Sequence, residues 1–174
     1  MEERTLNIGC GKDTWGTDRI DLHATPITTA VLNVDTENLP YPDNTFTEVR
    51  ILGAFEHFKN LGHVIDEVYR VMESGARLWV RTDHAGFIFF YILKKMEHSE
   101  ITRRWYNVDY FGHHQGEDHH YHLFVESHLR ALFKRFNDIK ITYFYMNPKS
   151  WKGWLLRRLP YKLGASQLDM VCYK

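Results

Sequence analysis

The feature that most constrains this chain is a short apolar strand that runs straight into a glycine loop. Thr5–Ile8 has the composition of a buried strand, and Gly9-Cys10-Gly11 follows it directly. The next strand is predicted at Thr17–Leu22. Because helices in globular proteins average about 11 residues, the gap between Gly11 and Thr17 has no room for a full helix.

This loop differs from the glycine loops that bind phosphate. A dinucleotide site reads G-x-G-x-x-G, and the N-terminus of the following helix faces the pyrophosphate. Here Lys12-Asp13-Thr14 follows the second glycine, and the G-K-[ST] ending of a P-loop is also missing. The loop therefore indicates either a ligand that approaches the backbone without phosphate or a simple tight turn.

The rest of the sequence alternates strands with helices, which is typical of a single α/β domain over residues 1–174. Asn60 is expected to cap the first long helix, and Gly75 is expected to follow its end. Residues 102–124 form a His- and aromatic-rich loop region, and residues 147–165 form a basic connection with two tryptophans. The remaining strands are predicted at Ala30–Val34, Phe46–Leu52, Ala76–Arg81, Ile139–Met146 and Leu168–Tyr173, and further helices at Ala85–Met96 and Ser127–Phe136.

Charge and composition exclude several classes of protein. The net charge is zero, with 12 Lys/Arg against 19 Asp/Glu in residues 1–125 and 10 against 3 in residues 126–174. This balance disfavours a general nucleic-acid binder. No apolar run reaches the roughly 20 residues of a membrane span, and the start lacks the pattern of a signal peptide. Because Cys10 and Cys172 form no disulfide framework, we expect a cytoplasmic protein.

Polar residues follow several of the predicted strands. Asp21, Asp35, Gly53–His57 and Asp83-His84 all lie at carboxyl ends, where open α/β sheets bind ligands. A carboxylate after the second strand suits a ribose diol, and another after the third suits an exocyclic amine. Adenosine carries both groups.

These residues resemble the class I S-adenosylmethionine-dependent methyltransferases, and the small type-11-like branch most. The resemblance covers roughly Leu6 to His84, with a looser match through Phe136. It implies a Rossmann-like, mostly parallel sheet with an antiparallel last strand. The chain departs from the family in that the helix between strands one and two is reduced or absent. It is carried by Leu6-Asn7-Ile8-Gly9-Cys10-Gly11, Asp18-Arg19-Ile20-Asp21, the segment Asp35 to Phe46, Phe55-Glu56-His57-Phe58 and the segment Glu67 to Leu78.

The resemblance also implies the cofactor, S-adenosyl-L-methionine, and the residues around it. Gly9, Cys10 and Gly11 would lie beneath its methionine part, and Asp21 would accept hydrogen bonds from its ribose. The family's usual acid two residues before the first glycine is Asn7 here. The full set of implied cofactor residues is Asn7, Gly9, Cys10, Gly11, Asp21, Leu22, Asp35, Thr36, Gly53 and Ala54.

The acceptor side is less well defined. His57 and His84 are the candidate catalytic bases, although each could simply hydrogen-bond a loop. The expected substrate-side set is Glu56, His57, His84, His120 and His122. The cluster His113–His122 could line or cover the pocket, form a solvated loop or bind a metal. We favour the pocket and predict no metal, because adjacent histidines in a loop point in different directions.

The segment Lys149–Lys162 interleaves five basic residues with tryptophan and leucine. Such a stretch can contact a membrane surface, but we favour a connection whose tryptophans pack on the last strands.

The function predicted from the sequence is methyl transfer from S-adenosylmethionine to a small molecule, a sugar or a lipid-linked glycan, with nucleic acid disfavoured. One alternative is a binding or regulatory module that keeps the fold without activity. A second is a nicotinamide-dependent oxidoreductase, which the short gap after Gly11 disfavours.

Overall fold

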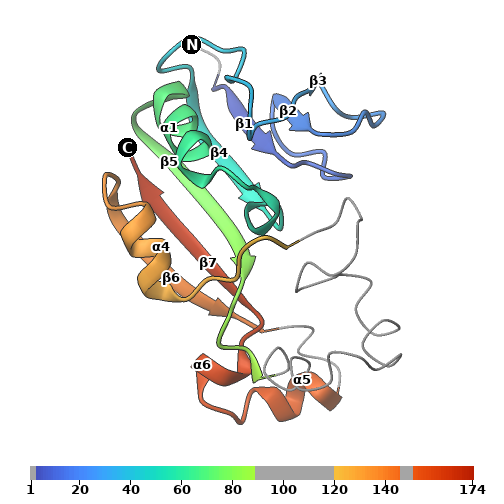
Figure 1. The fold of residues 1–174 in the computed structure, drawn as a ribbon, viewed down its shortest axis with the longest axis vertical. Helices are drawn as coiled ribbons and strands as arrows, with labels where there is room; N and C mark the ends of the chain where they lie inside the picture. Colours follow the sequence, from blue (N-terminus) through green and yellow to red (C-terminus); the bar gives the residue numbers. More distant parts are fainter. Residues whose placement is uncertain (1–2, 89–119, 146–150) are drawn as a thin grey trace.

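The computed structural model describes residues 3–88, 120–145 and 151–174, which form one seven-stranded sheet in the order β3-β2-β1-β4-β5-β7-β6 (Figure 1). The strands are β1 (Thr5–Ile8), β2 (Asp18–Asp21), β3 (Ala30–Val31), β4 (Phe46–Leu52), β5 (Met72–Asp83), β6 (Asn137–Phe144) and β7 (Gln167–Tyr173). The helices are η1 (Phe55–His57), α1 (Leu61–Val71), α4 (Glu126–Leu132), α5 (Trp151–Leu156) and α6 (Tyr161–Gly164).

Strand direction divides the sheet into two parts. The strands β1 to β5 are parallel to their neighbours, whereas β7 lies antiparallel between β5 and β6. This arrangement confirms the predicted Rossmann-like methyltransferase sheet. The carboxyl ends of β1, β4 and β5 point toward the same lower edge in Figure 1, where α5 and α6 also lie.

The hydrophobic core lies between the sheet and the helices α1 and α4. Val64 and Val68 of α1, and Leu129 of α4, are almost fully buried in one apolar cluster with the strand residues. The ring of Tyr69 on α1 lies 5.1 Å from that of Phe136, four residues after the end of α4. Regular spacing of apolar residues therefore predicted that both helices exist, although α4 ends at Leu132 and not at the predicted Phe136.

The other face of the sheet is more polar. Arg50, Trp79, Arg81 and Asp169 alternate along β4, β5 and β7 with fully buried neighbours. Arg81 donates two hydrogen bonds of 2.8 Å to Asp169, and Trp79 Nε1 donates to the same carboxylate. Parallel sheets are normally apolar on both faces, so polar pairing of this kind replaces part of the usual apolar cover.

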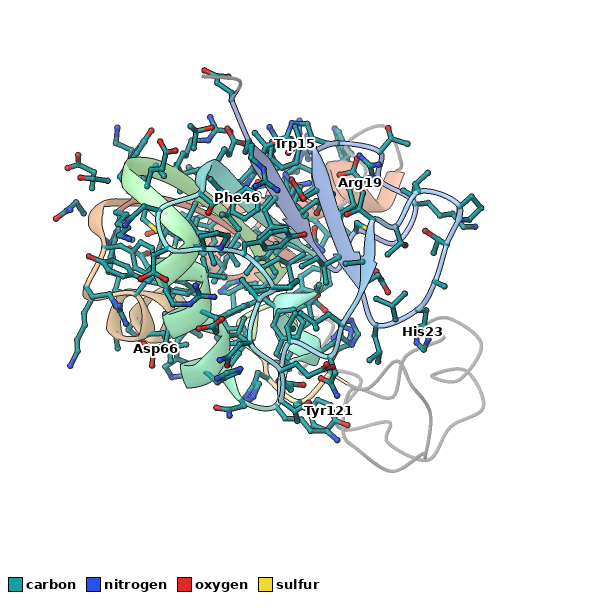
Figure 2. The ribbon with its side chains drawn as sticks, turned by 90° about the horizontal axis from the view of Figure 1, so that it is seen from above. Trp15, Arg19, His23, Phe46, Asp66 and Tyr121 are labelled. Atoms are coloured by element: carbon teal, nitrogen blue, oxygen red, sulfur yellow. The ribbon has the colours of Figure 1, made fainter. Side chains whose placement is uncertain are left out.

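A turn connects β1 to β2 in place of a helix, as the sequence predicted. Asn7 is buried, and its side-chain amide donates to Asp13 Oδ2 and to the Trp15 carbonyl, both at 3.3 Å. Both partners are acceptors, which explains why an amide suits this position better than an acid. The ring of Trp15 then stacks on the Arg50 guanidinium, 3.5 Å away, on the opposite side of the sheet from Asp66 of α1 (Figure 2).

Several predicted boundaries were wrong. Gly75 does not follow the end of α1, because the helix ends at Val71 and passes directly into β5, where Gly75 adopts a φ of +80°. The third strand is shorter than predicted, at Ala30–Val31. By contrast, the Asn60 side chain accepts a hydrogen bond from the His63 amide and confirms the predicted cap.

Two predicted regions lie partly outside the described residues. The expected Ala85–Met96 helix is described only as far as residue 88, and the His cluster only from His120 onward. None of the helices in the described parts of the chain is long and apolar enough to cross a membrane.

Candidate functional site

The glycine loop packs tightly on one side. Gly9 has a φ of +70°, and a Cβ placed on it would lie 2.3 Å from the Cβ of Ala54. Its amide and that of Cys10 donate to the Ile20 carbonyl at 2.8 and 3.1 Å. Cys10 is buried, which raises the pKa of its thiol. The loop is therefore fixed between β2 and the loop that follows β4.

Two other glycines, Gly11 in the same loop and Gly53 after β4, border open space. Gly11 and Gly53 have φ values of +51° and +70°, and a Cβ on either would meet no atom within 4 Å. Asp21 Oδ2 accepts a hydrogen bond of 2.8 Å from the Gly11 amide, and its Oδ1 accepts from the His23 amide. Asp21 is thus held at the rim of this backbone cradle, and each of its oxygens keeps a lone pair for another donor.

Asp35 lies in a turn four residues after the end of β3 and connects two loops. Its Oδ1 accepts hydrogen bonds from the amides of Lys59 and Asn60 at 2.8 and 2.9 Å, which leaves Oδ2 as its second acceptor. Leu22 and Thr36, which follow Asp21 and Asp35 in the chain, are exposed. The described structure therefore brings the implied cofactor residues to one edge, except that Asn7 and Cys10 point into the interior.

The residues expected on the substrate side begin directly after the cradle, because η1 follows Gly53 and Ala54 in the chain. Glu56 of η1 is 2% exposed and accepts a 2.8 Å hydrogen bond from the Thr82 hydroxyl. Burial, reinforced by repulsion from Asp83, raises the pKa of Glu56 to about 7. A carboxyl group that titrates near neutral pH is typical of functional sites.

Segment 120–122 is hydrogen-bonded to η1 through its backbone. The Glu56 carbonyl accepts from the amides of Tyr121 and His122 at 2.9 and 3.2 Å. This contact brings the ring of His120 to 4.4 Å from that of His57, edge to face. The Nδ1 atom of His120 lies 3.2 Å from Asp83 Oδ2 at the end of β5, although the contact lacks the geometry of a good hydrogen bond.

This carboxylate–imidazole arrangement has two possible chemical uses. Asp83 can orient the His120 ring and stabilise an imidazolium, as carboxylates do for catalytic bases. Alternatively, ligand atoms of Glu56, His57 and His120 lie within 4.8 Å of one another and could hold a metal ion. We call Glu56, His57, Asp83 and His120 the acid–histidine cluster.

His84 and His122 lie apart from this pairing. His84 is 2% exposed, and its Nδ1 lies 3.0 Å from the Ala165 carbonyl, while burial lowers the pKa of the ring. The Nε2 atom of His122 is buried and has no hydrogen-bond partner among the described residues. The geometry places His84 in a structural contact, so His57 and His120 are the better placed histidines.

The sequence analysis placed Asp83 at a strand end but gave it no role. Neighbouring residues of a strand point to opposite faces. Asp83 and His84 therefore face different surroundings, and only one of them can join the cluster. The alternation of side chains along β5 indicated that Asp83 and His84 face opposite sides. Deciding which of them belongs to the site required the position of His120, which is far away in the sequence.

Comparisons with known proteins agree with this fold. Residues 16–80 match the family model described as a methyltransferase domain. No curated protein matches the sequence significantly.

Solved structures match the whole fold at low sequence identity. An S-adenosylmethionine-dependent methyltransferase from Archaeoglobus fulgidus is 15% identical, with a TM-score of 0.67 over 99% of this chain and 86% of its own. A phosphoethanolamine N-methyltransferase from Haemonchus contortus, in complex with S-adenosylhomocysteine, is 14% identical, with a TM-score of 0.59 over 99% of this chain and 48% of its own. A putative methyltransferase from Haloferax volcanii, in complex with the Trm112 activator, is 14% identical, with a TM-score of 0.58 over 99% of this chain and 83% of its own.

Proposed function

We propose that this chain, a class I S-adenosylmethionine-dependent methyltransferase by its fold and its methyltransferase-domain match, methylates a hydroxyl or amine group of a small molecule, a sugar or a lipid-linked glycan. One observation carries the proposal. The open backbone cradle at Gly11 and Gly53 continues directly into η1, which holds two members of the acid–histidine cluster.

The cofactor fits the cradle chemically. A Cβ at Gly11 or Gly53 would meet no atom, so a ligand can approach the backbone there. Asp21 would accept from the ribose hydroxyls, Asp35 would accept from the adenine amine, and the backbone at Gly53 would face the methionine amino group. When bound, the cofactor supplies an activated methyl group, so the hard chemistry does not depend on a protein nucleophile.

The protein's own work is to orient the acceptor and remove its proton. His120 is placed to take that proton because Asp83 faces its other ring nitrogen and would stabilise the imidazolium. His57 lies against the His120 ring and would confine the acceptor beside it. Orientation of this kind contributes several kcal/mol to catalysis in general.

The test is a methyl-transfer assay with S-adenosylmethionine that carries a labelled methyl group. The acceptor pools are small hydroxyl and amine compounds, free sugars and lipid-linked glycans, and Asp21→Ala is the negative control. We expect label in one pool with the native protein and little with the variant. Binding of S-adenosylhomocysteine without label in any pool would instead support the inactive binding module.

A further inference from the structure

The segment from α5 to α6 exposes an unusual number of large apolar side chains. Eight large hydrophobic residues are exposed among the described residues, and four of them lie between positions 154 and 163. These are Trp154, Leu155, Tyr161 and Leu163, which are 42–56% exposed. We call residues 154–163 the α5–α6 surface. The sequence analysis favoured tryptophans packed on the last strands, and the exposure of Trp154 shows that this prediction was wrong for this residue.

The same surface is positively charged. Arg157, Arg158 and Lys162 are exposed on it, and residues 149–162 contain five Lys/Arg and no Asp/Glu. The Arg158 guanidinium lies 3.8 Å from the centre of the Trp154 ring. Stacking of this kind keeps a charged head and an aromatic ring together at the protein surface.

The exposed side chains belong to a segment that is anchored from beneath. Leu156 is 5% exposed and packs with Phe87 in a small apolar cluster that also includes Leu123. The ring of Tyr161 lies 4.8 Å from that of Tyr143 on β6. The segment therefore has its own buried apolar side, and the exposed residues form a second apolar set that faces outward.

We propose that the α5–α6 surface docks on an anionic lipid bilayer. Its basic side chains match anionic headgroups, and its Trp, Tyr and Leu side chains suit the boundary between headgroups and acyl chains. Charge complementarity alone would also fit a nucleic acid. The outward apolar set favours lipid, because phosphate contacts do not use exposed leucines.

The position of this surface connects docking with the site. Leu123, beneath the α5–α6 surface, follows shortly after His120, and the Ala165 carbonyl after α6 contacts His84 at the end of β5. The surface therefore lies at the same edge of the sheet as the acid–histidine cluster (Figure 1). Docking would bring this edge to the bilayer and favour an acceptor held in the membrane. This consequence for the acceptor rests on the proposed function, whereas the docking proposal does not depend on it.

Vesicle co-sedimentation tests the proposal, with phosphatidylcholine vesicles against mixed phosphatidylcholine–phosphatidylglycerol vesicles at low salt. We expect binding to the mixed vesicles only. The double variant Arg157→Gln/Arg158→Gln should weaken binding to the mixed vesicles about 25-fold, because each basic residue contributes about a factor of five. Trp154→Ser/Leu155→Ser should weaken it about tenfold or more. The control Lys134→Gln/Lys140→Gln removes two exposed charges outside the α5–α6 surface and should change binding less than about threefold, because salt screens distant charges.

Two results would overturn the proposal. The first is absence of native binding to the mixed vesicles. The second is unchanged binding by Trp154→Ser/Leu155→Ser, which would indicate a general polyanion site. Each variant is also titrated with S-adenosylhomocysteine, so a failure of docking with intact cofactor binding is distinguishable from a failure of the proposed function.

Discussion

The two sides of the carboxyl edge are built in different ways. On the cofactor side, the contact that places Asp21 joins it to Gly11, only ten residues earlier. On the substrate side, Glu56 contacts Thr82 and the backbone of Tyr121, and Asp83 meets His120. The contacts that hold Asp21 are therefore local, whereas the expected substrate side forms only when distant segments meet.

The largest expected effect is on the substrate side. His120→Asn should lower the methyl-transfer rate about 10²- to 10⁴-fold, the usual contribution of a general base, while S-adenosylhomocysteine binds as before. The matched control is His122→Asn, two residues along the same segment, for which we expect less than about a tenfold loss in rate, since it removes no base. Equal losses in the two variants would show that the segment only shapes the pocket.

On the cofactor side, two glycines of one loop give a matched pair. Gly9→Ala should lower the free energy of unfolding by about 3 to 4 kcal/mol. The new Cβ is unfavourable in the left-handed backbone conformation of this position, and it also clashes with Ala54. Gly11→Ala has the positive φ without the clash and should cost about 1 kcal/mol. Chemical denaturation measures both, and equal losses would contradict the tight packing of Gly9.

The buried Glu56 predicts a pH dependence that Glu56→Gln should remove. Its pKa rises from 4.5 to about 7 on folding, so the unfolded chain releases this proton first as the pH increases. The contribution of Glu56 to the free energy of unfolding therefore falls between pH 4.5 and pH 7 and is constant outside that range. The total change is about 3 kcal/mol.

Denaturation of the native protein and of Glu56→Gln across this pH range measures the difference. Gln keeps an oxygen that can accept from the Thr82 hydroxyl, which makes it a matched variant. Parallel stability curves for the two proteins would show that Glu56 ionises as freely in the folded state as in the unfolded one.

The smallest expected effect is that of metal removal. Glu56, His57 and His120 could hold a metal ion, but the proposed chemistry needs only a base and an activated methyl group. We expect the methyl-transfer rate to be the same before and after dialysis against a chelator. A loss of activity that zinc or nickel restores would assign the acid–histidine cluster to a metal instead.

Features that depend on residues close together in the sequence are the ones that the sequence predicted best. The short connection after Gly11 and the cap at Asn60 depend on neighbouring residues, and the structure confirms both. Gly75 was misread because a glycine with positive φ can also occur within a strand, where β5 continues past it. The pairing of Asp83 with His120 depends on tertiary contacts, so no local pattern could predict it.

Isothermal titration with S-adenosylhomocysteine, on the native protein and on Asp21→Ala, tests the central claim most directly. The account predicts binding by the native protein and affinity about 10- to 100-fold lower for the variant, because hydrogen bonds to a charged carboxylate contribute about 1.5 to 3 kcal/mol. NAD should not bind. Absence of S-adenosylhomocysteine binding to the folded native protein, or binding of NAD in its place, would contradict the account.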